Sequence, residues 1–340
     1  ERCRVFADEG RAVSVVGVSE HEISLLGVRH LGCCFGGVCT DPDYRGRGLA
    51  TQLLIDAREQ ALRRGADIAL ISGSRGLYRR LGYVTVGGYH VCTVKRSRLP
   101  PGGGCVLRPW RPEDAPALVR ICAAERARWV RTPQEFVERL KGGGVGGRSG
   151  ETRIVCPRDK DEPVAYIAYQ IGGWPWEKKD RNAVSVAEMG GSRWAIAQVL
   201  AALLDERKVS SLTLHYPDCD TEMAELARTF GWPTKPRGFR GTVGIIDPER
   251  FWQRCMPLFA ERLGRERAGR LRLDANGSVR ITYGCEAVEL DGMSGITKLV
   301  FLPSRRRKEL HLGLGADSQL ARALDELFPL PLVDWGLNYT

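Results

Sequence analysis

One segment of the sequence, residues 37–54, constrains the fold more than any other. It reads as a strand that passes through a turn of alternating arginine and glycine directly into a helix. Backbone N–H groups at a helix N-terminus lack partners, and the helix dipole adds about half a positive charge there. Gly46 and Gly48 let an anion approach the backbone, while Arg45 and Arg47 add charge. The segment therefore predicts a phosphate-binding turn on a fold that joins strands to helices.

Two other phosphate motifs fit this turn badly. The sequence contains no G-x-x-x-x-G-K-[ST] loop. The dinucleotide fingerprint needs glycine or alanine at its sixth position, where Thr51 follows Gly46. The alternative without a ligand is a plain strand-to-helix turn that happens to be rich in arginine.

A proline- and glycine-rich linker, residues 99–104, divides the chain. Ahead of it the patterns predict strands at 4–8, 12–18, 21–40 and 68–71, helices at 50–64 and 76–81, and a strand pair at 83–94. Beyond it they predict strands at 105–108, 163–171, 183–188 and 211–216, and helices at 194–204 and 221–230. The order strand, loop, helix, strand, helix thus occurs twice, which suggests an internal duplication.

The composition changes again from about residue 247. An amphipathic helix at 251–263, four strand-like pieces and a helix at 318–327 predict an α+β region. The basic run 305–308 lies between apolar stretches at 299–302 and 310–314, which favours a solvated hairpin tip. We therefore expect three domains, at 1–98, 105–245 and 246–340.

The composition excludes several classes of protein. The sequence has no run of about 20 apolar residues and no apolar secretion signal, so we expect no membrane partner. The net charge is +10, but the basic residues are spread along the chain, so we expect no nucleic-acid partner. Eleven cysteines without a C-x-x-C pair predict reduced thiols, no metal site and a cytoplasmic location.

Two motifs identify a family resemblance. The pattern R-x-x-G-x-A at Arg45, Gly48 and Ala50 resembles the acetyl-CoA loop of the GCN5-related N-acetyltransferases (GNAT). Downstream, Tyr78 and the Gly82-Tyr83 pair resemble that family's Y-x-x-x-G-[FY] segment. With the repeat, the α+β region and the aromatic C-terminal tail, the whole chain resembles the three-domain Eis-type (enhanced intracellular survival) acetyltransferases.

The resemblance implies a fold of the α/β (α+β) class. It consists of tandem GNAT domains, each a mixed, mostly antiparallel sheet with flanking helices, and a C-terminal domain similar to sterol carrier proteins. Two departures stand out. The strand and two helices that normally open a GNAT domain do not precede Arg2, so we expect the chain to be a fragment. The second repeat has no basic residue where its loop should start, at Glu188–Arg193, so we expect it to bind no CoA.

The resemblance also implies the site. The backbone of Val38 and Thr40 would hold the pantetheine arm and polarise the thioester carbonyl. Tyr78 would be the general acid that protonates the leaving thiolate. The C-terminal carboxylate of Thr340 would act as base or amine anchor, with His30 and Glu22 as rival bases. The residues assigned to acetyl-CoA are Val38, Cys39, Thr40, Arg45, Gly46, Arg47, Gly48, Leu49 and Ala50.

The predicted activity is direct acetyl transfer from acetyl-CoA to an amine, either an aminoglycoside-like polyamine or a lysine side chain, in a homo-oligomer. A non-catalytic acyl-CoA sensor is the alternative, and a lipid-binding protein is a third interpretation. We expect Cys39 to be a small buried residue and Tyr83 to serve packing. Trp174, Trp176 and Trp194 are also expected to pack.

Overall fold

The computed structural model describes residues 2–172, 183–315 and 317–339, which form two compact units. The first unit combines residues 1–87 with 239–332, and the second combines 88–238 with 333–339. These boundaries cut the chain differently from the three predicted domains, which stay a prediction. No helix of the described residues is long and apolar enough to cross a membrane.

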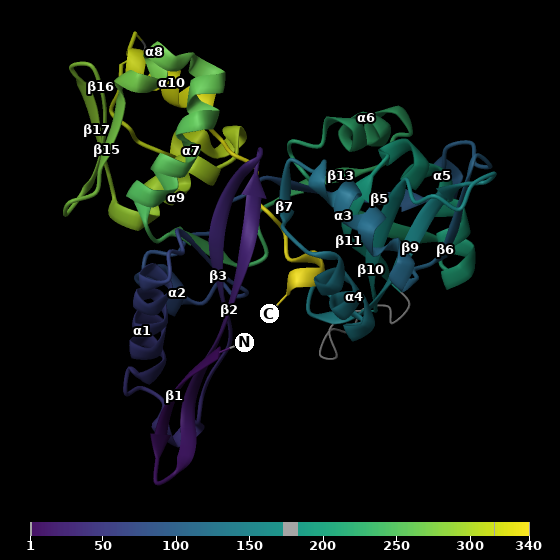
Figure 1. Cartoon of the computed structure of the whole chain (residues 1–340), viewed down its shortest axis with the longest axis horizontal. Coiled ribbons are helices and arrows are strands. Elements are labelled where there is room, and N and C mark those ends of the chain that lie inside the picture. Colours follow the sequence, from purple (N-terminus) through teal and green to yellow (C-terminus); the bar gives the residue numbers. More distant parts are fainter. Residues whose placement is uncertain (1, 173–182, 316, 340) are drawn as a thin grey trace. The chain divides into compact units, whose positions relative to one another are not determined.

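The first unit is built on a mixed sheet with the strand order β1-β2-β3-β4-β14. Figure 1 labels its long strands β1, β2 and β3. Its strands are β1 (Arg2–Asp8), β2 (Arg11–Leu25), β3 (Val28–Thr40), β4 (Ile68–Ile71) and β14 (Thr242–Ile245). Strands β3 and β4 run parallel, and the other neighbours in this order are antiparallel. Helix α1 (Leu49–Arg63) and the short helix α2 (Gly76–Arg80) follow the predicted positions closely.

Helix α1 forms where its apolar residues recur on one face. Leu53, Leu54, Ala57 and Ala61 are buried, and they pack with Phe35 in one apolar cluster. This spacing is the one that places side chains on a single helix face. The helix ends before Gly65, whose φ of 91° favours glycine, as the sequence predicts.

The rest of the first unit comes from the C-terminal third of the chain. It contains the helices α7 (Pro248–Leu263), α8 (Arg265–Arg270), α9 (Gly292–Phe301) and α10 (Gln319–Leu327). A three-stranded antiparallel sheet is formed by β15 (Leu271–Asp274), β16 (Val279–Tyr283) and β17 (Glu286–Leu290). Helix α7 packs on β3, where Phe251 stacks on His30 with ring centroids 4.6 Å apart.

The second unit contains a larger mixed sheet in the order β13-β5-β12-β11-β10-β9-β6, with β8 (Gly144–Val145) paired to β9. Its strands are β5 (Tyr89–Lys95), β6 (Cys105–Pro109), β9 (Arg148–Pro157), β10 (Ala165–Ile171), β11 (Val184–Gly191), β12 (Ser211–Pro217) and β13 (Thr234–Arg237). Helices α3 (Ala115–Ala123), α4 (Pro133–Gly142), α5 (Arg193–Arg207) and α6 (Thr221–Thr229) cover it, and β7 (Ala127–Trp129) is a short additional strand. Strand β10 shows how both faces are filled: Ile167 packs in one apolar cluster and Tyr166 in another.

Several predicted elements are wrong. Residues 21–40 form no single strand, because a turn at Leu26-Gly27 separates β2 from β3. Both turn residues have a positive φ. This conformation is rare for leucine, so Leu26 gave no sequence signal of a turn. The predicted pair at 83–94 is one strand, β5, with an isolated bridge at Val84. The apolar stretch 299–302 ends helix α9, since short apolar runs do not distinguish strand from helix. The basic run lies in a 3₁₀ segment, Ser304–Glu309, and residues 310–314 form no strand.

Candidate active site

The predicted turn begins where β3 continues beyond its parallel partner. The two strands pair from Gly32–Ile68 to Phe35–Ile71, and β3 then continues to Thr40. Ligands of open α/β sheets bind at the carboxyl ends of parallel strands, so this is a favourable position for a site. The pairing of β2 with β3 also shifts here, because one residue of β2 faces Gly37 and Val38 together. Such a bulge leaves backbone groups outside the ladder and is common beside active sites.

The residues after the bulge fix the turn to the β1–β2 hairpin. The Ser14 hydroxyl lies 2.9 Å from Thr40 Oγ1 and donates to the Cys39 carbonyl at 3.2 Å. A 3₁₀ turn, Pro42–Tyr44, follows, and the Tyr44 hydroxyl donates to Asp8 Oδ2 at 2.5 Å. These contacts fix the start of the turn to strands β1 and β2.

Gly46 and Gly48 both adopt a left-handed conformation with φ of 77°. A side chain is strained at such a φ. A Cβ at either position would meet no protein atom within 4 Å, so the space in front of both glycines is open. Helix α1 begins directly after Gly48 without a hydrogen bond from any capping side chain. Its first N–H groups therefore present an anion site of the predicted kind.

Two arginines add charge to this helix end. Arg45 Nε donates to the Thr40 carbonyl at 3.2 Å, and an Arg47 N–H donates to the Asp43 carbonyl at 3.1 Å. Arg47 also lies 4.7 Å from the ring centroid of Tyr44. Within residues 2–172, 183–315 and 317–339, neither guanidinium is paired with a carboxylate. Both positive charges thus remain available to a ligand.

Tyr78 lies on the short helix α2 and is only 4% exposed. Its ring packs against Gly73, where an added Cβ would lie 2.9 Å from Tyr78 Cε2. Burial raises the pKa of the phenol above its usual value, although nearby Arg75 opposes this shift. The hydroxyl is therefore protonated at neutral pH, as a proton donor must be. Tyr83 is 1% exposed in the apolar cluster with α1, which confirms the predicted packing role.

The other predicted cofactor residues lie on the same stretch. Val38 is half-buried and packs against the apolar cluster, while Leu49 and Ala50 are half-buried in the first turn of α1. The prediction that Cys39 is buried is wrong, because its side chain is exposed. The bulge explains this: Cys33 and Phe35 face the apolar cluster, but after the extra residue Val38 faces it, so Cys39 points to the opposite side.

The two rival bases do not join this site. His30 is buried, with Nδ1 2.8 Å from Asp67 Oδ2 and its ring stacked on Phe251. It precedes Val38 by eight residues on one strand, which corresponds to about 26 Å at ~3.3 Å per residue. Glu22 faces Leu31 in the β2–β3 pair and is paired with Arg29 at 2.9 Å. His30 is a core residue, and Glu22 belongs to an exposed ion pair.

The corresponding loop of the second unit has different chemistry. Helix α5 is capped by Ser192, whose hydroxyl accepts from the Ala195 N–H. The adjacent Arg193 is buried and bonded to Glu125 at 2.6 Å and Asp220 at 2.7 Å. The protein's own side chains therefore occupy this helix end.

Three predicted residues lie outside the described part of the chain: Thr340, Trp174 and Trp176. Trp194 stacks on Phe230, with ring centroids 6.3 Å apart, but remains 47% exposed, so only part of its surface packs. Sequence reasoning missed the bulge at Gly37 and Val38, for which the Gly36-Gly37 pair inside a strand was an available signal.

Residues 1–86 match the family described as acetyltransferase (GNAT) domain. No curated protein matches the chain.

Three solved structures share the fold over nearly the whole chain. A GCN5-related N-acetyltransferase from Kribbella flavida is 16% identical, with a TM-score of 0.65, covering 100% of this chain and 88% of its own. A probable N-acyltransferase from Enterococcus faecalis is 13% identical, with a TM-score of 0.68 and coverages of 99% and 89%. Eis1 from Mycobacterium abscessus is 17% identical, with a TM-score of 0.64 and coverages of 100% and 90%. Residues 1–86 therefore form a domain of the GNAT acetyltransferase family, and the whole chain has a fold that an Eis protein shares.

Proposed function

We propose that this protein transfers an acetyl group directly from acetyl-CoA to a primary amine, with Tyr78 as the general acid. The observation that carries the proposal is the helix end at Gly48. Among the described residues, no side chain caps this helix end and no carboxylate pairs with the two arginines beside it, and two left-handed glycines precede the helix. A pyrophosphate is the ligand that this combination fits best.

Each residue has a separate part in the proposed reaction. Arg45 to Ala50 bind the pyrophosphate, and the strand residues from Val38 to Thr40 pair with the pantetheine arm. The N–H of Val38, which lies at the bulge, donates to the thioester oxygen as negative charge develops there. The amine attacks the carbonyl carbon, the carbon–sulfur bond breaks, and the Tyr78 hydroxyl gives its proton to the leaving sulfur.

The incoming ammonium must also lose a proton. We assign this part to the carboxylate of Thr340, on the family resemblance alone. A terminal carboxyl has a pKa of about 3.5, far below that of an ammonium, so it acts chiefly by binding the amine and relaying its proton through water. A net charge of +10 would not attract a polyamine, so the acceptor needs a local acidic surface. Glu135 and Glu138 line a hollow in the second unit together with Tyr339, the neighbour of Thr340.

The proposal extends to the whole chain. We assign the second unit's sheet to a degenerate GNAT repeat and residues 246–340 to a sterol-carrier-like domain, with an aminoglycoside-like polyamine or a lysine as acceptor. A homo-oligomer in the cytoplasm, without a metal, completes the proposed description.

The test is amine-dependent release of free CoA thiol, measured with acetyl-CoA and a panel of amines. Tyr78→Phe should lower kcat by about 10²- to 10⁴-fold and leave the KM for acetyl-CoA unchanged. Tyr83→Phe is the matched control, because the buried Tyr83 hydroxyl has no hydrogen-bond partner in the described chain. Binding of CoA without release for any amine would favour the sensor interpretation, and absence of CoA binding would contradict the assignment of the turn.

A further inference from the structure

The second unit repeats the strand arrangement of the proposed active site. Parallel strands β11 and β12 pair from Val184–Leu212 to Val186–Leu214, after which both continue without further pairing to each other. Ala187 is an extra residue opposite β10, so β11 bulges directly after its last parallel pair, whereas in β3 the paired Gly36 lies between the last parallel pair and the bulge. Helix α5 starts only seven positions after Val186, whereas α1 starts fourteen positions after Phe35.

The chain's own C-terminal tail, residues 333–339, binds at this bulge. Glu188, the next residue after Ala187, accepts from the Leu337 N–H at 2.8 Å. A Cβ on Gly336 would lie 1.9 Å from the same carboxylate, so the tail backbone passes directly over it. Gly336 has a positive φ of 47°, which favours glycine at this place.

A buried ion pair orients Glu188 toward the tail. Arg131 donates to both Glu188 oxygens, at 2.6 and 2.9 Å, and its Nε donates to Asn338 Oδ1 at 2.7 Å. Tyr166 adds a hydroxyl donor to Glu188 at 2.8 Å. A buried ion pair contributes little net stability compared with apolar residues of the same volume. This ion pair instead orients the tail, because Glu188 bonds to the tail backbone and Arg131 bonds to a tail side chain.

Further contacts fix the tail on both sides of Glu188. Trp129 Nε1 donates to the Asp334 carbonyl at 2.7 Å, and the Gly146 N–H donates to the Gly336 carbonyl at 2.6 Å. Asn338 is only 1% exposed. Several hydrogen bonds thus hold the last described residues, although they form only a 3₁₀ turn, Gly336–Asn338.

We propose that Glu188 and Arg131 are positioning residues, which hold the C-terminal tail, residues 333–339, for the role proposed above for the Thr340 carboxylate. The proposal rests on the function proposed above. In the second repeat, the strand position that corresponds to the cofactor strand binds the chain's own C-terminus instead.

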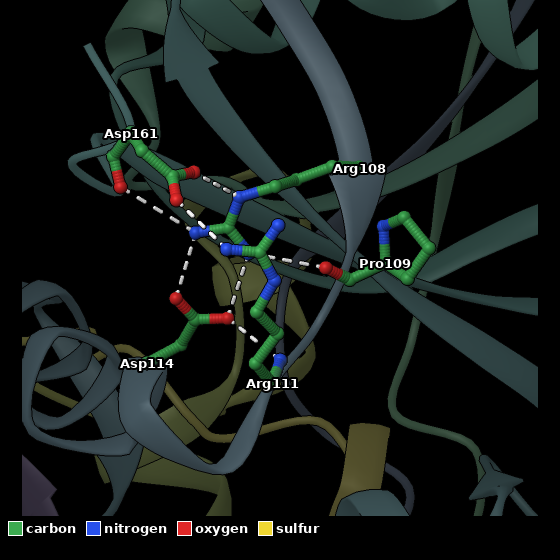
Figure 2. A network of polar contacts seen from close by, with 5 residues as sticks. All are labelled: Arg108, Pro109, Arg111, Asp114 and Asp161. Atoms are coloured by element: carbon green, nitrogen blue, oxygen red, sulfur yellow. Dashed lines mark hydrogen bonds and ion pairs between the residues drawn. The ribbon is translucent and has the colours of Figure 1, made fainter.

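The experiment compares two buried ion pairs of the second unit. Glu188→Gln removes the charge that holds the tail. Asp114→Asn is the control, because Asp114 accepts from both terminal nitrogens of Arg108 at 2.8 Å in a network with Arg111 and Asp161 (Figure 2). Among the described residues, Arg108 and Asp114 make no hydrogen bond to the tail.

Glu188→Gln should lower kcat 10- to 100-fold without changing the KM for acetyl-CoA, whereas Asp114→Asn should change neither. Deletion of Thr340 should lower kcat by a similar factor, and Glu188→Gln in that background should lower it no further, because both changes remove the same effect. Independent, multiplying losses in the double variant would overturn the proposal.

A second readout does not depend on activity. Carboxypeptidase should release the last residues of Glu188→Gln at least ten times faster than those of the unchanged protein and of Asp114→Asn. An unchanged release rate would contradict the proposed role of Glu188 in holding the tail. If release accelerates but deletion of Thr340 leaves kcat unchanged, Glu188 holds the tail as proposed, and the role proposed for the Thr340 carboxylate is wrong.

Discussion

At the scale of single residues, replacing either glycine of the turn, Gly46 or Gly48, should have two separate effects, one on stability and one on ligand binding. Gly48→Ala places a side chain at a φ of 77°, which costs about 1–2 kcal/mol in the free energy of unfolding. It also places a methyl group in the open space where a pyrophosphate would lie. We expect the affinity for acetyl-CoA, measured by calorimetry, to fall at least tenfold.

Gly277→Ala separates these two effects. Gly277 lies between β15 and β16 with a φ of 95° and no neighbouring atom within 4 Å of the position of a Cβ. This variant should lose a similar amount of unfolding free energy in a denaturant titration and keep its affinity for acetyl-CoA. Equal affinities in the two variants would show that the turn does not contact the ligand.

The second residue-scale prediction concerns pH. Because burial raises the pKa of Tyr78 above its usual value of about 10, the hydroxyl stays protonated through the neutral and mildly alkaline range. With Tyr78 as general acid, kcat at saturating substrates should not fall as the pH rises from 7 to 10. A decline centred below pH 9 in the unchanged enzyme, absent from Tyr78→Phe, would contradict a buried phenol as the donor.

At the scale of elements, the N-termini of α1 and α5 distinguish the two halves of the molecule. Ser192 caps α5, whereas no side chain caps α1. Ser192→Ala should therefore lower the free energy of unfolding by about 0.5–2 kcal/mol and leave CoA binding unchanged. Calorimetry should find one acetyl-CoA per chain in both proteins. A second binding event, altered by the substitution, would contradict the expectation that the second loop binds no CoA.

Elements with a strong local signal were predictable from the sequence. Helix α1 has apolar residues on one face and a glycine after its end, and strand β4 is a short apolar run that lies where the pattern predicts it. The turn at Leu26 could not be predicted, because a leucine with a φ of 51° leaves no sequence signal. The exposed side of Cys39 depends on the bulge, which shifts the register of the strand.

Contacts between distant parts of the sequence were the hardest features to predict. From the sequence, Glu188 was only one residue of a degenerate loop. Its role could not be predicted, because its partner Leu337 lies 149 positions away. The strands that complete each sheet also come from outside the predicted segments. Strand β14 joins β4, and β5 joins β12, so each compact unit draws on parts of the chain that the linker at 99–104 appeared to separate. Local patterns contain no information about such pairings.

At the scale of the whole molecule, the first unit should unfold as one body although it is assembled from two distant stretches of chain. Asp67 is fully buried between them, 2.8 Å from His30 Nδ1 and 3.0 Å from an Arg254 nitrogen. Its backbone carbonyl also accepts from the Ile246 N–H at 2.9 Å. Asp67→Ala leaves His30 and Arg254 without this carboxylate, which costs about 3–5 kcal/mol.

Hydrogen exchange can show whether β4 and α7 both lose this stability when Asp67 is replaced. If β4 and α7 belong to one cooperative unit, Asp67→Ala should lower the opening free energies of their slowest amides by the same amount. The slowest amides of β10, in the second unit, are the internal control and should keep theirs. A loss of protection confined to α7, with β4 unchanged, would mean that residues 246–340 open as a domain of their own, as the three-domain division requires. Equal losses would mean that the proposed cofactor turn is carried by a scaffold to which the C-terminal third of the chain contributes directly.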